Sequence, residues 1–166
     1  MNRIPERKRI RLDEYDYSQK GAYFITICAK DRHNLFGEIS VGATVPGRPH
    51  GSHIELAEAG KCIENAITYY NANMSEVIFD KYVIMPNHIH AIVLLISTET
   101  GDRGRSPLQY VVRNLKAYVT KQIGFSPWQK SFHDHIIRSE DDYNRICKYI
   151  DDNPILWSED CYYPKN

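Results

Sequence analysis

The sequence has no excess of charge of either sign and no hydrophobic stretch long enough to cross a membrane. Lysine and arginine together number 21, and aspartate and glutamate also number 21. The longest uninterrupted apolar run, 91–96, has six residues, whereas a transmembrane helix needs about 20. The N-terminal stretch MNRIPERKRIRL is charged and lacks the apolar region of a secretory signal. These features argue against a membrane protein and against a secreted one.

The four cysteines form no pair at metal-binding or redox spacing. They are scattered along the chain, so neither a zinc ribbon nor a dithiol redox site is indicated: Cys28, Cys62, Cys147 and Cys161. Without a secretory signal we expect reduced thiols and a cytoplasmic location. A length of 166 residues with 42% hydrophobic residues is ordinary for one globular domain. We therefore expect a single domain over 1–166, with a basic N-terminal arm over 1–20.

The charge is unevenly distributed although its sum is zero. Residues 1–11 carry a local net charge of +4, and residues 103–130 contain six basic residues and no acidic one. Residues 139–160 contain seven acidic residues. Contacts with a polyanion are local, because salt screens charges beyond about 8–10 Å. The two basic segments are therefore compatible with a nucleic-acid partner, although solvated helix faces would have the same composition.

Hydrophobic periodicity predicts seven elements in the order strand, helix, strand, strand, helix, strand, helix. Their predicted ranges are 22–29, 54–73, 77–85, 88–96, 107–123, 131–137 and 140–152. The first six follow the β-α-β-β-α-β order of the ferredoxin-like fold. The fold class is thus α+β, with an antiparallel sheet, helices packed on one face and an additional C-terminal helix.

The boundaries of these elements rest on turn and capping residues. Glycine and proline in 42–52 predict a loop, and the polar segment 97–105 predicts another. Ser52 and Glu55 have the spacing of a capping box, which predicts the start of the first helix. The turn at Pro86 and Asn87 predicts a β-hairpin.

Two histidines follow that turn at the spacing of neighbours on one face of a strand. His88 and His90 project to the same side, while Ile89 points to the other. Two adjacent imidazoles can hold one metal ion, and a merely solvated sheet face is the alternative. A second pair, His133 and His135, lies on a short predicted strand, where one packed and one exposed histidine is the simpler interpretation.

Tyr149 and Asn153 lie four residues apart at the end of the last predicted helix and therefore share one face. A phenol with a pKa near 10 is a poor nucleophile at neutral pH. A nearby cation would stabilise its phenolate, and an amide oxygen could complete a metal site with two histidines. An aromatic side chain in the core stripe of the helix is the alternative.

Two segments together resemble a known family. The string MPNHIHAIVLL (85–95) resembles the His-hydrophobic-His (HUH) motif of single-tyrosine transposases. The string WQKSFHDHIIRSEDDYNRICKYIDDNPILW (128–157) resembles the C-terminal part of the REP-associated tyrosine transposases, relatives of the insertion-sequence-200 type. The similarity extends over about 22–157, and the motifs share the order and spacing of the family.

The resemblance implies a ferredoxin-like HUH nuclease that cleaves and rejoins single-stranded DNA through a 5′-phosphotyrosine. Tyr149 would be the nucleophile, and His88, His90 and Asn153 would bind a divalent ion, Mg²⁺ or Mn²⁺. The family often has a lysine at the position of Lys116, in a helix close to DNA. The substrate would be single-stranded DNA with hairpin or palindromic character, and the protein a monomer or a homodimer.

Three basic residues of the fifth predicted element and one that follows the sixth extend this expectation to DNA contacts. We expect DNA binding by four basic residues: Arg113, Lys116, Lys121 and Arg138. Two other functions stay open at this point. One is a non-catalytic protein that binds single-stranded nucleic acid on the same fold. The other is a zinc hydrolase that uses both histidine pairs.

Overall fold

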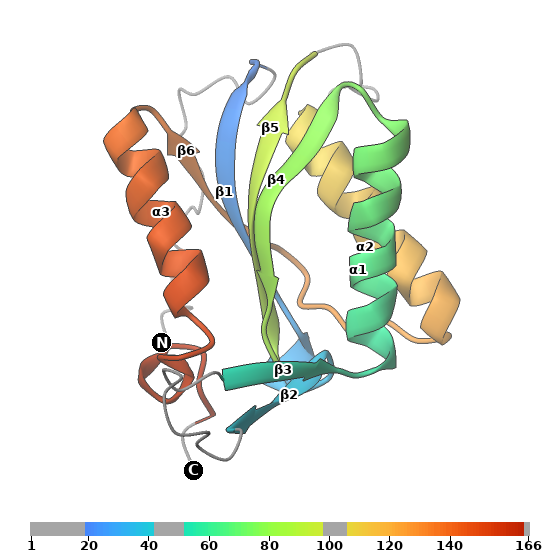
Figure 1. Cartoon of the computed structure of the whole chain (residues 1–166). Coiled ribbons are helices and arrows are strands. Elements are labelled where there is room, and N and C mark those ends of the chain that lie inside the picture. The colour runs from blue at the N-terminus through green and yellow to red at the C-terminus, as the bar shows by residue number, and fades with distance from the viewer. Residues whose placement is uncertain (1–18, 42–51, 98–105, 165–166) are drawn as a thin grey trace, which may run out of the picture.

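A computed structural model describes residues 19–41, 52–97 and 106–164 (Figure 1). Most of the predicted basic arm, nearly all of the 42–52 loop and most of the 97–105 loop lie outside these ranges. The main sheet has four strands in the order β4-β5-β1-β6. The bounds of these strands are Gly21–Cys28 for β1, Val77–Ile84 for β4, His88–Leu95 for β5 and His133–Ile137 for β6.

All neighbouring strands of this sheet are antiparallel, and β1 and β5 occupy its centre. This is the order expected of a β-α-β-β-α-β fold, so the predicted class and topology are confirmed. The β4–β5 hairpin turns at Pro86 and Asn87 as predicted. Its register places Ile84 opposite Ile89, so the two histidines fall at the start of β5.

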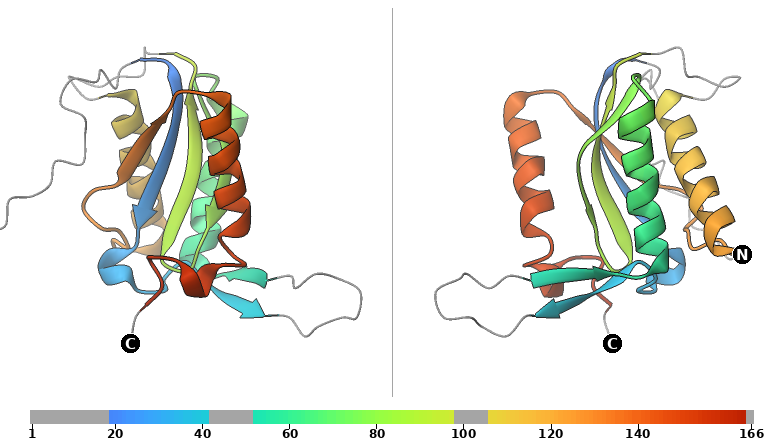
Figure 2. Two further views of the ribbon diagram at one scale, coloured as in Figure 1. Left: turned by 90° about the vertical axis from the view of Figure 1, so that its left-hand side faces the viewer. Right: turned by 45° about the vertical axis from the view of Figure 1, so that its right-hand side comes forward.

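The helices cover both faces of the sheet. Helices α1 (Glu58–Asn73) and α2 (Pro107–Ile123) pack on one face, and α3 (Glu140–Asp152) lies on the other (Figures 1 and 2). The odd-numbered β5 residues from Ile89 to Leu95 belong to the core beneath α1 and α2. On the opposite face Ile92 packs with Ile146 and Ile150 of α3. Period-2 alternation in the central strands thus separates a large core from the side that carries the histidines.

The start of the first helix differs from the prediction. Residues Ser52–Leu56 form strand β3, which pairs with β2 (Gly37–Val41) in a separate two-stranded sheet. Helix α1 begins at Glu58 after Ala57, which makes no side-chain cap, so the capping box at Ser52 and Glu55 was a wrong interpretation. The stretch His-Ile-Glu-Leu (53–56) alternates polar and apolar residues, and pairing with β2 makes it a strand.

The other two helices have the capping residues that their sequences indicate. Ser106 accepts a hydrogen bond from the backbone N–H of Gln109, and Gly124 ends α2 with φ of +81°. Ser139 accepts from the backbone N–H of Asp142 at the start of α3. Within the described ranges, no helix combines the length and the apolar character that crossing a membrane requires.

Candidate active site

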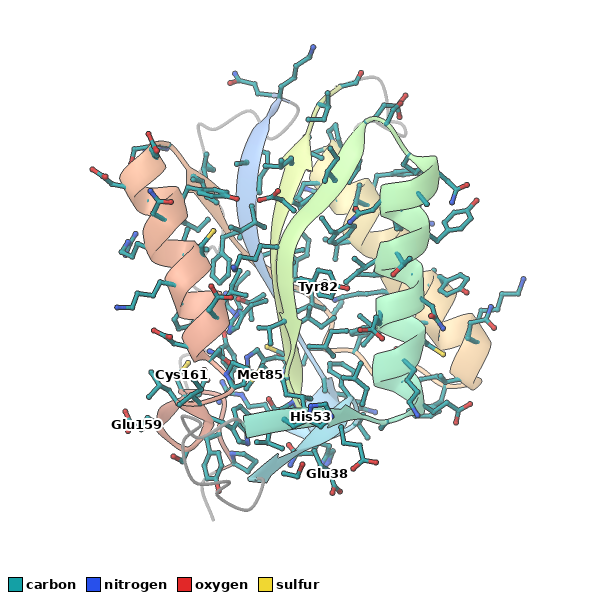
Figure 3. All side chains as sticks on the ribbon, in the orientation of Figure 1. Glu38, His53, Tyr82, Met85, Glu159 and Cys161 are labelled. Atoms are coloured by element: carbon teal, nitrogen blue, oxygen red, sulfur yellow. The ribbon has the colours of Figure 1, made fainter. Side chains whose placement is uncertain are left out.

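His88 and His90 lie side by side in the interior, not on a solvated sheet face. Their exposed fractions are 0% and 1%, and their ring centroids are 4.4 Å apart. The C-terminal segment (153–164) provides much of their cover, since Trp157 and Tyr162 pack their rings at 5.8 Å and 4.5 Å from His88. Figure 3 shows this segment below α3, where Glu159 and Cys161 are labelled, beside the end of the hairpin at Met85.

Asn87, the residue of the hairpin turn, holds His88 in one orientation. Its side-chain oxygen lies 2.9 Å from Nδ1 of His88. Its side-chain nitrogen donates to the backbone carbonyls of Arg32 and Tyr162, which fixes the orientation of the amide. Because the amide oxygen can only accept, Nδ1 of His88 carries the proton and Nε2 keeps its lone pair. The sequence suggested a turn residue here, and the structure adds this second role.

His90 is held in the same way from the neighbouring strand. Thr26 of β1 lies opposite it in register, and its hydroxyl oxygen is 2.8 Å from Nδ1 of His90. The phenol oxygen of Tyr149 lies 3.2 Å from the other ring nitrogen, Nε2. Tyr149 comes from α3, is 42% exposed, and its ring centroid lies 5.1 Å from that of His90. The structure therefore brings Tyr149 to the histidine pair.

Asn153 and Asp160 complete the group. Asn153, one helical turn after Tyr149, is buried and donates from Nδ2 to Oδ2 of Asp160 at 2.8 Å. Asp160 also accepts from the backbone N–H of Tyr162 at 2.6 Å. Ligand atoms of His88, His90 and Asp160 lie within 4.8 Å of one another. Sequence reasoning missed Asp160, because nothing in its spacing distinguishes it from the other acidic residues near the C-terminus.

The buried position of the site sets the charge of its groups. Burial lowers the pKa of His88 to about 3, the Arg32 guanidinium acts in the same direction, and Asn153 opposes it. Burial and the neighbouring His88 lower the pKa of His90 well below its usual range, with Asp160 in opposition. Both imidazoles are therefore neutral at pH 7. Burial and, second, Asp160 raise the pKa of the Tyr149 phenol, which stays protonated.

This set of donors fits a divalent cation. Nε2 of His88 and Oδ1 of Asn153 are buried without a hydrogen-bond partner in the described part of the chain. Buried polar atoms are rarely left unpaired, and a bound ion is one of the groups that satisfies them. Neutral imidazole nitrogens, an amide oxygen and the Asp160 carboxylate are all established ligand types for divalent metals.

The basic residues expected to bind DNA are not at this site. Arg113 and Lys121 are exposed on α2, across the sheet from the histidines, and Arg138 is exposed just after β6. The Lys116 ammonium donates to the backbone carbonyls of Gln129 and Ser131, at 2.9 Å and 3.0 Å. Burial lowers its pKa to about 8. Lys116 thus holds the segment that leads to β6.

The second histidine pair does not join the first. His133 is exposed, and Nε2 of His135 lies 2.7 Å from Oδ2 of Asp142 on α3. Among the described residues, the possible metal-binding group contains neither of them. The zinc hydrolase with four histidine ligands therefore has no support in the structure.

Comparisons with known proteins place this site in context. The chain is 34% identical to an uncharacterised protein of Haemophilus influenzae, over an alignment covering 96% of this chain and 94% of that one. No family model matches the chain. In structure it resembles a REP-associated tyrosine transposase that was solved bound to a REP hairpin. That similarity has a TM-score of 0.61 at 21% identity, and covers 89% of this chain and 74% of the other.

At 21% identity the structural likeness establishes the fold, and it agrees with the resemblance read from the sequence motifs. The chain belongs to one family with the Haemophilus influenzae protein, and it has the fold of the REP-associated tyrosine transposases.

Proposed function

We propose that this protein is a transposase-type endonuclease that cleaves and rejoins single-stranded DNA through Tyr149, with a divalent metal ion. The observation that carries the proposal is the position of the Tyr149 phenol, 3.2 Å from Nε2 of His90 and beside two buried atoms without partners. A half-exposed phenol at a possible metal site is accessible to a strand in solvent. The fold shared with a REP-associated tyrosine transposase supports the same reaction class.

The residues that would hold the ion are His88, His90 and Asn153, and the Asp160 carboxylate beside them stays available as a proton acceptor. When bound, a divalent cation such as Mn²⁺ or Mg²⁺ supplies positive charge for a phosphoryl oxygen and for a phenolate. Asn87 and Thr26 orient the two imidazoles so that each presents Nε2. Such support of the ligands is a general requirement of metal sites.

Tyr149 would attack the phosphorus atom of the DNA backbone. The new bond joins the phenol oxygen to phosphorus, the bond from phosphorus to the 3′ oxygen breaks, and that oxygen takes up a proton from water as it leaves, giving a 3′-hydroxyl. The phenol proton needs an acceptor, because burial holds the pKa of Tyr149 above its ordinary value. With Nε2 of His90 engaged as a ligand, Oδ2 of Asp160 lies 3.5 Å from the phenol oxygen and can accept it.

The proposed substrate is single-stranded DNA that carries a hairpin. The structural neighbour was solved with a REP hairpin, and we extend that substrate class to this chain by proposal. Arg113, Lys116, Lys121 and Arg138 remain proposed DNA-binding residues. The exposed basic side chains of α2, Arg113 and Lys121, are suited to contacts with DNA phosphates. Such contacts carry no sequence information.

The test uses labelled single-stranded DNA from the flanks of the protein's own gene, incubated with and without Mn²⁺. We expect a covalent protein–DNA band on a denaturing gel, dependent on the metal and absent from Tyr149→Phe. Tyr143→Phe is the matched control, because Tyr143 lies on the same helix and bonds to Asp80 of β4 instead. An adduct with the Tyr149 variant would contradict the proposal. Binding without any adduct would favour the non-catalytic nucleic-acid-binding protein.

A further inference from the structure

A pocket opens beside Tyr149, where α3 faces the strands β1 and β6. Its volume is about 440 Å³, and it is lined by Phe24, His135, Arg145, Ile146 and Tyr149. We propose that this pocket binds one unpaired nucleobase of the DNA strand that Tyr149 attacks. The identity of the strand rests on the proposed function, whereas the pocket and its chemistry stand on their own.

Phe24 connects the pocket to the candidate active site. Its ring stacks on His90, with centroids 5.3 Å apart and planes at 27°. It also meets the Tyr149 ring edge to face, at 6.0 Å. One aromatic ring therefore touches the metal-binding histidine, the nucleophile and the pocket at once. A base seated against Phe24 would belong to a nucleotide adjacent to the reacting phosphate.

The lining has the chemistry of a base-binding site. Phe24 and Ile146 give it apolar surface, and bases of any sequence stack on aromatic side chains. Arg145 adds a planar guanidinium that can stack on a base or donate to its edge. A volume of about 440 Å³ lies in the range of small-molecule sites and leaves room for one nucleobase.

The polar rim of the pocket is held in place by Asp142. One oxygen of this carboxylate lies 2.7 Å from Nε2 of His135, and the other accepts from Arg145 at 2.5 Å. Asp142 itself is fixed at the start of α3, where its backbone N–H donates to Ser139. Ion pairs as exposed as this one contribute little to folding. The arrangement instead positions His135 and Arg145 at the pocket mouth, which gives His135 a role.

The test measures how protein variants and missing bases act together. Tyr149→Phe is used as the background, so that no strand is cleaved while binding is measured by fluorescence anisotropy. The probe is labelled single-stranded DNA from the flanks of the gene, with one base at a time removed to leave an abasic site. We expect one abasic position to weaken binding roughly 5- to 150-fold, the range for base–aromatic stacking.

The abasic position that weakens DNA binding should no longer do so once a pocket residue is replaced. Phe24→Ala should weaken binding of the intact strand by a similar factor, and the abasic site should then cause little further loss. Arg145→Ala should show the same coupling more weakly, and it cannot unfold the protein because its side chain is 75% exposed. Tyr69→Ala, which removes a 60% exposed aromatic from α1, is the control and should show no coupling.

Each result decides between the two proposals. If no abasic position couples to Phe24→Ala or Arg145→Ala, the pocket is not a nucleobase site, whether or not Tyr149 forms an adduct. If coupling is found and the wild type forms no adduct, the base site stands and the proposed cleavage reaction is wrong. If Phe24→Ala fails to fold, Phe24→Leu and Arg145→Ala decide the question. Failure of the wild type to bind these strands overturns both proposals.

Discussion

Asn87 offers a sharp test of the site, because its buried side chain joins three parts of the molecule. It is 1% exposed and accepts from Nδ1 of His88 while donating to two backbone carbonyls. We expect Asn87→Ala to weaken Mn²⁺ binding roughly 10- to 100-fold, the usual effect of removing a residue that orients a ligand. Without Asn87, Nδ1 no longer has to carry the proton, so Nε2 of His88 loses its defined lone pair.

The same substitution should also destabilise the fold. It leaves the His88 N–H and the Tyr162 carbonyl without their partner, and each unpaired buried group costs about 1–3 kcal/mol. The Arg32 carbonyl belongs to an exposed residue and can bond to water instead. We therefore expect the free energy of unfolding to fall by roughly 2–6 kcal/mol. Urea unfolding followed by circular dichroism measures this change.

A second asparagine separates the two effects. Asn71 of α1 makes a pair of hydrogen bonds to the backbone of Phe79, at 2.9 Å and 2.8 Å, far from the histidines. Asn71→Ala should lower stability and leave Mn²⁺ affinity, measured by isothermal titration calorimetry, unchanged. If Asn87→Ala binds Mn²⁺ as tightly as Asn71→Ala does, the assignment of Nε2 of His88 as the ligand atom is wrong.

Three further predictions follow from the described contacts. Ile89→Asp should lower the free energy of unfolding by on the order of 4–5 kcal/mol in urea titrations, because it puts an unpaired charge into the core beneath α1 and α2. A mild effect would contradict the placement of Ile89 on the buried face of β5. The pKa of His88 in the folded protein lies near 3, below its ordinary value of 6.5, so the metal-free protein should lose stability as pH falls from about 6.5 towards 3. The His88→Gln variant should have a flatter profile of stability against pH. A wild type whose stability does not depend on pH would refute the burial argument. Lys116→Ala should lower the melting temperature, because the carbonyls of Gln129 and Ser131 lose their hydrogen-bond donor. Arg113→Ala should leave stability intact and reduce the salt dependence of DNA binding. An unchanged salt slope would remove Arg113 from the DNA contacts.

Sequence periodicity was enough to predict the four strands of the main sheet and the three α-helices in their order, and which residues share a face. Side chains alternate along a strand, so the placement of His88 and His90 together, with Ile89 opposite, followed from spacing alone. Likewise the four-residue spacing of Tyr149 and Asn153 predicted that both share one face of α3, and the structure turns that face toward the histidines. These are local, periodic properties, and local geometry fixes them before any packing is known.

Only the tertiary structure decided what surrounds those residues. Asp160 reaches the histidines because the chain turns back after α3, and no periodic signal announces such a turn. The strand at Ser52–Leu56 exists because β2 pairs with it, and that pairing partner outweighs a plausible helix cap. Half-buried Lys116 bonds to carbonyls of a segment 13 and 15 residues further on, which a charge count cannot reveal. Contacts between segments distant in the chain depend on how whole elements pack, so a sequence read locally cannot supply them.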